Sequence, residues 1–140
     1  MPQLIFINLP VSDLKRSTEF YEATGGTKNP QFSDDTASCI VISDVIHVML
    51  LTHDKYRQFT SKAIADARTT SEVMIALTVN ERSAVDALVE KAKAAGGGID
   101  PTPTQDFGFM YGRSYEDPDG HIWEVVWMDM AAAPQEPANA

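Results

Sequence analysis

The sequence contains two copies of one local pattern, and this duplication constrains the fold more than any other feature. In each copy a strand end is followed by a helix-capping residue, an acidic residue and, after a helix, adjacent glycines. A repeat this long, present twice, indicates a duplicated module rather than a solenoid of short repeats. The alternative is an α+β domain whose halves look alike by chance. The first copy begins with Leu9, Val11, Ser12 and Asp13, and the second begins 68 residues further on with Leu77, Val79, Asn80 and Glu81.

Hydrophobic periodicity assigns a strand, a helix and three further strands to each copy. The first helix is expected to begin at Ser12 or Asp13 and to end at the glycine pair 25–26, and the second to begin at Asn80 and end at glycines 96–98. Asp117-Pro118-Asp119-Gly120 predicts a type I turn with a glycine bulge. The expected strands are 4–9, 28–33, 37–42 and 46–52 in the first half, and 72–79, 99–104, 109–116 and 121–128 in the second.

The order of these elements predicts an α+β fold of two βαβββ modules, which form an open, cup-shaped mixed sheet with helices on the outer face. A chain of 140 residues fits a single domain over residues 1–130. Module one is expected at about 4–52, a linker with one or two short helices at about 53–70, and module two at about 71–130. Residues 131–140 are rich in Ala, Pro, Gln and Asn and are expected to be a disordered tail.

Charge and hydropathy exclude two classes of partner. The net charge of -9 argues against nucleic acid, which is bound mainly by basic surfaces. No apolar stretch approaches the roughly 20 residues that span a bilayer, so no membrane association is expected. The N-terminus lacks the basic start and apolar run of a signal peptide, and Cys39 is the only cysteine, so a cytoplasmic location is expected.

Alternation along the strands predicts which side chains share a face. The apolar faces are expected under the two helices, and the mixed faces are expected to point together into the concave side, where polar residues such as Asn8 and Glu72 need a partner. Glu124 is the sharpest anomaly, because it lies between Ile122 and Val126 on one strand face. The turn register predicts Ser114 opposite Glu124, and a one-residue shift reverses this. An alternative role for Glu124 is a structural ion pair with Arg113.

Two segments carry a family resemblance. Residues 8–21, with the Phe20-Tyr21 pair, and residues 108–124, with the Asp-Pro-Asp-Gly-x-x-x-Glu signature, resemble the vicinal oxygen chelate superfamily of glyoxalases, bleomycin resistance proteins and extradiol dioxygenases. The chain is most similar to a glyoxalase-like branch described as predicted lactoylglutathione lyases. The resemblance runs from about residue 4 to residue 130. It implies paired modules around a sheet-lined pocket, a small-molecule ligand and a homodimer.

The metal-dependent members of this superfamily hold a divalent ion, such as Ni, Zn, Mn or Fe, with ligands from four strands. The resemblance places those four positions at Phe6, Met49, Met74 and Glu124. Only Glu124 is a ligand type that suits such ions, since phenylalanine cannot bind a metal and methionine is a poor ligand for hard cations. His47, on the same strand face as Met49, is the one further candidate. We therefore expect no cofactor, with Glu124 as a metal ligand only if a metal is bound.

Three functions remain open. The first is binding of a small organic molecule without metal, as in the bleomycin resistance branch. The second is a metal-dependent lyase, isomerase or dioxygenase-related activity, for which a lactoylglutathione lyase-like reaction is the first expectation. The third is a metal-free enzyme in which Glu124 is the catalytic general base. The expected ligand-binding residues are Phe6, Asn8, His47, Met49, Met74, Arg113 and Ser114.

Overall fold

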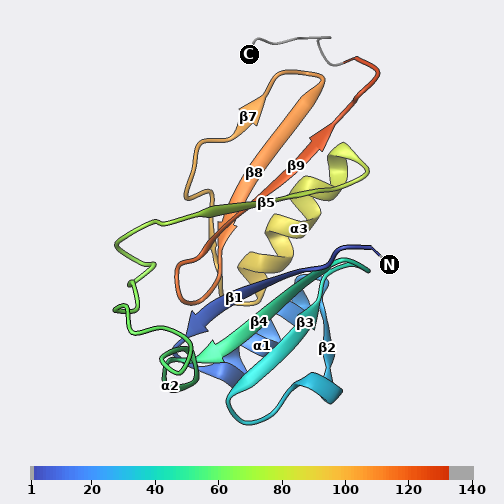
Figure 1. Cartoon of the computed structure of the whole chain (residues 1–140). Helices are drawn as coiled ribbons and strands as arrows, with labels where there is room; N and C mark the ends of the chain where they lie inside the picture. Colours follow the sequence, from blue (N-terminus) through green and yellow to red (C-terminus); the bar gives the residue numbers. More distant parts are fainter. Residues whose placement is uncertain (1, 133–140) are drawn as a thin grey trace.

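The computed structural model describes residues 2–132, and these form two β-sheets with one long helix against each (Figure 1). No helix in this described range is long and apolar enough to cross a membrane. Most of the expected tail, residues 133–140, lies outside the described residues.

Module one has the strand order β1-β4-β3-β2, with β1 parallel to β4 and the other neighbours antiparallel. Helix α1 starts where the sequence predicts, because the Asp13 side chain accepts a hydrogen bond from the backbone N–H of Arg16. The elements are β1 (Ile5–Val11), α1 (Leu14–Ala23), β2 (Thr27–Asn29), the 3-10 helix η1 (Pro30–Phe32), β3 (Ala37–Val41) and β4 (Ile46–Thr52).

Module two repeats this topology with the order β5-β9-β8-β6, and β5 is parallel to β9. The two modules therefore have the same arrangement, and the predicted α+β fold with duplicated βαβββ modules is confirmed. The elements are α2 (His53–Tyr56) in the connection and then β5 (Met74–Thr78), α3 (Arg82–Ala94), β6 (Gly98–Ile99), β7 (Gln105–Asp106), β8 (Met110–Glu116) and β9 (Ile122–Met128).

Several local predictions were wrong, each for a physical reason. The strand expected at 28–33 ends at Asn29, whose side chain caps η1, and Pro30 starts that 3-10 turn. The strand expected at 99–104 is broken into β6 and β7, because Pro101 and Pro103 lack the N–H that a ladder needs. Between them, residues 100–104 form an irregular bulge that leaves the ladder but still bonds to Ser114 of β8, and Asp100 takes a positive φ of 55°.

One helix boundary also differs from its prediction. The N-cap of α3 is Glu81 rather than Asn80, and no side chain caps this helix. The connection contains one short helix, α2, within the expected one or two, and residues 57–73 contain no further helix. Apolar residues of the connection such as Ala63 and Ile64 line the space between the two modules.

One hydrophobic core joins the modules. It contains helix-facing residues of both sheets, among them Leu9 and Leu50 from module one and Trp123 and Val125 from module two. Helices α1 and α3 contact each other in this region (Figure 1), and Phe20 of α1 packs against Tyr115 of β8. The helix-covered sides of the sheets thus face each other across the core. The opposite sides of both sheets point away from it.

Candidate functional site

The open face of module one consists of Phe6, Asn8, His47 and Met49, which we call the module-one face. Parallel pairing sets Phe6 beside His47 and Asn8 beside Met49. The rings of Phe6 and His47 are stacked, with centroids 4.5 Å apart and planes at 17°. Phe6 is 51% exposed, although its burial would be favourable. The surface therefore offers an aromatic and thioether platform that suits a flat or irregular organic group.

His47 adds a polar atom to this platform. Its Nδ1 atom is buried and has no hydrogen-bond partner within the described part of the chain. A buried polar atom without a partner is uncommon and costs free energy unless a water molecule or ligand satisfies it. The module-one face thus combines an apolar surface with one unsatisfied hydrogen-bonding group.

The open face of module two consists of Met74, Ala76, Ile122 and Glu124, which we call the module-two face. Parallel pairing sets Met74 beside Ile122 and Ala76 beside Glu124. Glu124 is half-buried, and no hydrogen bond or ion pair joins its carboxylate to another residue in the range 2–132. Met74 is 55% exposed. This face places an unpaired carboxylate among apolar side chains.

Ser114 lies opposite Glu124 on β8, as the turn register predicts. Its hydroxyl is fully buried, however, and is bonded to the backbone N–H and the hydroxyl of Thr102, at 3.1 and 2.7 Å. The bulge at 100–104 therefore covers this part of the sheet. Since the Ser114 hydroxyl is already used inside the fold, we do not include this residue in the ligand site.

Arg113 points to the helix-covered side of the sheet, and so does not pair with Glu124. Its guanidinium forms two bonds to Asp100, at 3.0 and 2.8 Å, and one to Asp86 on α3, at 2.9 Å. These bonds raise the pKa of Arg113 and lower the pKa of Asp100. The pKa of Asp86 is lowered by a hydrogen bond from Tyr111 and then by the bond from Arg113. The alternative ion pair between Glu124 and Arg113 is thus absent, and Arg113 instead connects β8 to α3.

Within one chain the two open faces meet only at their margins, where Asn8 of one and Ile122 of the other line the same cavity. The sequence led us to expect them to converge, but α1 and α3 occupy the space between the two sheets. Phe6, Met49, Met74 and Glu124 consequently lie on the outer sides of the sheets, and none of them lines the large cavities between the modules. Each face is one half of a possible site.

The donor atoms on these faces do not fit a divalent metal. The four positions that the resemblance assigns to ligands hold one carboxylate, one phenyl ring and two thioethers. No group of three or more His, Cys, Asp or Glu side chains that could hold an ion occurs in residues 2–132. One carboxylate cannot supply the ligands that a catalytic metal needs.

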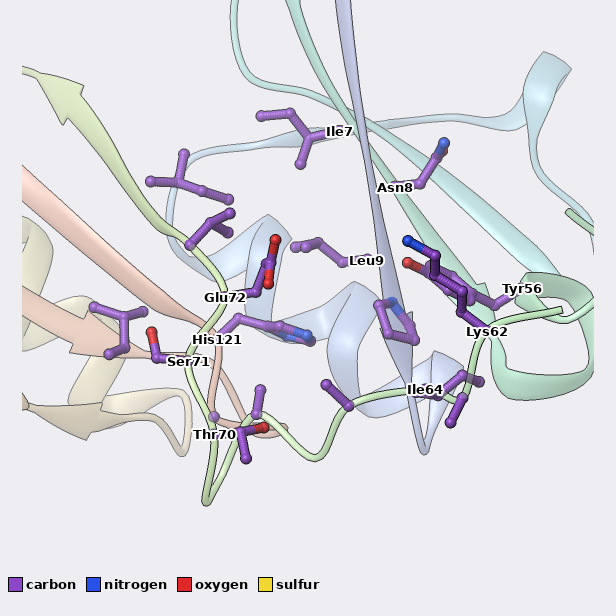
Figure 2. Close-up of a pocket in the computed structure, with 18 of the residues that line it drawn as sticks. Ile7, Asn8, Leu9, Tyr56, Lys62, Ile64, Thr70, Ser71, Glu72 and His121 are labelled. Atoms are coloured by element: carbon purple, nitrogen blue, oxygen red, sulfur yellow. The ribbon is translucent and has the colours of Figure 1, made fainter. Parts of the chain in front are cut away.

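A cavity of about 540 Å³ lies between the modules (Figure 2). Its walls come from β1, from the connection before β5, from β5 itself and from the turn before β9. Asn8 and Glu72, which the sequence analysis had associated with a concave site, both line this cavity. His121 also extends into it from the turn, as Figure 2 shows.

His121 is held by a buried hydrogen-bond network that the sequence analysis missed. Its Nδ1 atom lies 2.8 Å from Oδ2 of Asp117, whose side chain is fully buried. The same oxygen accepts a 2.6 Å hydrogen bond from the Tyr21 hydroxyl, and that hydroxyl accepts one from Nε1 of Trp123 at 2.9 Å. Asp117 and His121 are four residues apart across a tight turn, and this local pattern predicts the turn but not the network.

Comparison with known proteins shows a clear family. The family model for the Glyoxalase/Bleomycin resistance protein/Dioxygenase superfamily matches residues 3–125. The hypothetical protein SA1046 from S. aureus is 32% identical, with a TM-score of 0.75, and the match covers 91% of this chain and 94% of that one. No curated protein matches the chain.

Two further solved structures share the fold. A glyoxalase-related enzyme from Fulvimarina pelagi is 24% identical with a TM-score of 0.75, and the match covers 91% of this chain and 88% of that one. The fosfomycin resistance protein FosX from Listeria monocytogenes is 20% identical with a TM-score of 0.64, and the match covers 99% and 97%. At these identities the similarity carries the fold alone.

Proposed function

The chain belongs to the Glyoxalase/Bleomycin resistance protein/Dioxygenase superfamily, and from this premise we propose that it binds a small organic molecule on its open sheet faces without the usual metal. The observation that carries the proposal is the exposed Phe6 ring stacked on His47, beside a buried and unsatisfied Nδ1 atom. An aromatic platform with one hydrogen-bonding atom suits a ligand with a flat apolar part and a polar substituent.

The metal-free part of the proposal rests on residue chemistry. The positions where metal-dependent relatives are expected to place ligands hold Phe6, Met49 and Met74, and these side chains favour apolar contact over coordination. Glu124 is the one ligand-type residue among the four. In this proposal the apolar side chains carry the binding, and the charge of Glu124 is not required.

We further propose that a second copy of the chain completes the binding site. Strands β1 and β5 each have a neighbour on one side only, so each is an edge strand. Both strands carry exposed large apolar side chains, with Ile5 of β1 at 53% and Met74 of β5 at 55%. Exposed apolar edges favour pairing with another chain. A two-fold homodimer that pairs β1 of one protomer with β5 of its partner places the module-one face against the module-two face, and does so twice.

A thermal-shift screen of small organic compounds with the purified protein tests the binding proposal. A ligand at about 100 times its Kd is expected to raise Tm by roughly 5–10 °C. The shift should be lost in Met74→Glu, which puts a charge into the apolar surface, and retained in Glu124→Gln, the matched control with an unchanged shape. A shift that survives Met74→Glu would contradict the proposal.

The unpaired Glu124 carboxylate supports a second candidate, in which it is the base of a metal-free enzyme. A carboxylate among apolar side chains, with no partner in the range 2–132, is available to take a proton from a bound carbon acid. A compound that still binds to Glu124→Gln but is converted only by the wild-type protein would favour this enzyme over simple binding. A metal-dependent lyase would instead need added metal for conversion.

A further inference from the structure

The inter-module cavity shares only Asn8 and Ile122 with the open sheet faces, and its other lining residues give it a different chemistry. Its walls are mostly apolar, with side chains such as Leu9, Ile64 and Ile75. The charged or titratable groups among its lining side chains include Lys62, Glu72 and His121 (Figure 2). A volume of about 540 Å³ lies within the range of small-molecule sites, which are typically apolar with a few polar groups.

The hydrogen bonds around Asp117 determine which nitrogen of His121 carries its proton. Oδ1 of Asp117 accepts hydrogen bonds from the backbone N–H groups of Asp119 and His121, with N–O distances of 3.0 and 2.8 Å. Oδ2 accepts the Tyr21 hydroxyl and faces Nδ1 of His121. A carboxylate that accepts from all these donors acts as an ionised acceptor, so Nδ1 of the neutral imidazole must be the donor.

Tyr21 is a donor, not an acceptor, in its hydrogen bond with Asp117. Burial raises the pKa of Tyr21 well above its ordinary value, and the charge of Asp117 raises it further. The hydroxyl therefore keeps its proton and donates it to Asp117, while Trp123 donates to the hydroxyl oxygen. The donor directions along Trp123, Tyr21 and Asp117 are thus fixed, which leaves Nδ1–H as the tautomer of His121.

We propose that the inter-module cavity is a second ligand site, in which His121 accepts the proton of a small, weakly acidic and largely apolar molecule such as a phenol. With Nδ1 donating to Asp117, Nε2 carries a free lone pair. The ligand O–H bond breaks, the proton forms the Nε2–H bond, and the electron pair remains on the ligand oxygen. Asp117 stabilises the imidazolium, and Lys62 and Glu72 are further charged groups in the lining of the cavity. Asp117 is the positioning residue.

Nuclear magnetic resonance of the full-length protein tests the tautomer directly. The chain has three histidines, at 47, 53 and 121, and each has a different environment, so their side-chain nitrogen signals can be assigned separately. The proposal expects His121 to be protonated at Nδ1 and unprotonated at Nε2 in the neutral form. A neutral His121 with its proton on Nε2 would overturn it.

Titration with 4-nitrophenol tests the site, because its visible absorption distinguishes the phenol from the phenolate. At a pH where the free probe is largely protonated, we expect bound phenolate and a shifted Nε2 signal for His121 alone. His121→Gln should bind the probe about tenfold more weakly and as the neutral phenol. Phe107→Ala, which changes an exposed side chain that lines none of the three cavities, should leave both readouts unchanged.

The two binding proposals fail in distinguishable ways. A probe that shifts the His47 signal, or whose binding depends on Met74, would place it on the open faces and overturn the inter-module site. Binding as the neutral phenol to the wild-type protein, or equal affinity in His121→Gln, would overturn the proton-accepting role. A folded His121→Gln variant, judged by an unchanged Tm and amide spectrum, is required for the comparison to count.

Discussion

At the scale of single residues, Tyr21 connects the two modules through one oxygen atom. It comes from α1 of module one, and both of its hydrogen-bond partners, Asp117 and Trp123, belong to module two. Removing the hydroxyl leaves the Trp123 N–H unpaired and takes one donor from a buried carboxylate. The position is therefore sensitive to a change of one atom.

We predict that Tyr21→Phe lowers the free energy of unfolding by about 1–3 kcal/mol, the usual cost of leaving buried polar groups unsatisfied. Urea denaturation measures it. Tyr111→Phe is the matched control, because the Tyr111 hydroxyl bonds to Asp86 at the surface, and its loss should change stability by less than about 1 kcal/mol. Equal effects of the two substitutions would contradict the assigned role of Tyr21.

The same tyrosine predicts a loss of stability in alkali. Burial raises the pKa values of Tyr21 and Tyr115 above that of an unfolded tyrosine, which is about 10. Below that pH both tyrosines are protonated in the folded and in the unfolded chain, so they do not make the free energy of unfolding depend on pH. Above it the unfolded chain releases protons that the folded chain retains, so the free energy of unfolding falls as pH rises. Denaturation between pH 8 and 11 measures this slope, which should be shallower in Tyr21→Phe.

Sequence reasoning at the residue scale succeeded where only strand alternation and turn register were needed. The pairing of Ser114 with Glu124 followed from the Asp117–Gly120 turn alone. The partners of Arg113 and Ser114 could not be predicted, because Asp86 comes from a helix and Thr102 from an irregular bulge. Local periodicity contains no information about such contacts.

At the scale of elements, the turn before β9 fixes the connection between the modules. Gly120 has a φ of 98°, and an added Cβ would lie 2.8 Å from the Ala67 backbone. A side chain at this position is therefore excluded by conformation and by space together. Residues 67 and 68 of the connection therefore pack directly against the turn that precedes His121.

We predict that Gly120→Ala is more destabilising than Gly25→Ala by roughly 1–3 kcal/mol. Gly25 has a similar φ of 110° but nothing within 4 Å of an added Cβ, so its substitution measures conformational strain alone, about 1–2 kcal/mol. Denaturation of both variants gives the difference. Equal losses would mean that the contact with residues 67 and 68 contributes nothing.

The longer, strongly periodic elements were predicted correctly, and the short irregular ones were not. Strand β4 and helix α1 have the expected positions, since apolar spacing and Asp13 define them locally. The connection after β4 was expected to contain one or two short helices, because its apolar spacing resembles that of an amphipathic helix, and it contains α2 alone. In the structure those side chains instead line the cavity between the modules.

At the scale of the whole molecule, the shared core explains why the sites could not be located from sequence. Strand alternation correctly separates helix-facing from open residues, but it does not say how two sheets are placed relative to each other. Here the helices lie between the sheets, so the open faces diverge and a cavity remains between the modules. That placement depends on contacts such as Phe20 with Tyr115, which join the halves.

The proposed homodimer makes a prediction at the same scale. Ile5→Lys introduces a charge at the exposed end of β1 and should convert the dimer to a monomer, because an unpaired charge in an apolar contact is costly. Phe107→Lys is the control, since Phe107 is similarly exposed but lies between β7 and β8. Sedimentation velocity distinguishes the states. A monomeric wild-type protein would contradict the proposal.

Metal content and metal titration of the purified protein test the central claim most directly, because the claim is that the open faces bind an organic ligand without a metal. Elemental analysis followed by calorimetric titration with Ni²⁺, Zn²⁺, Mn²⁺ and Fe²⁺ is the measurement. We predict no stoichiometric metal and no difference between the wild-type protein and Glu124→Gln. One equivalent of any of these ions per chain, bound by the wild-type protein and lost in Glu124→Gln, would contradict the account.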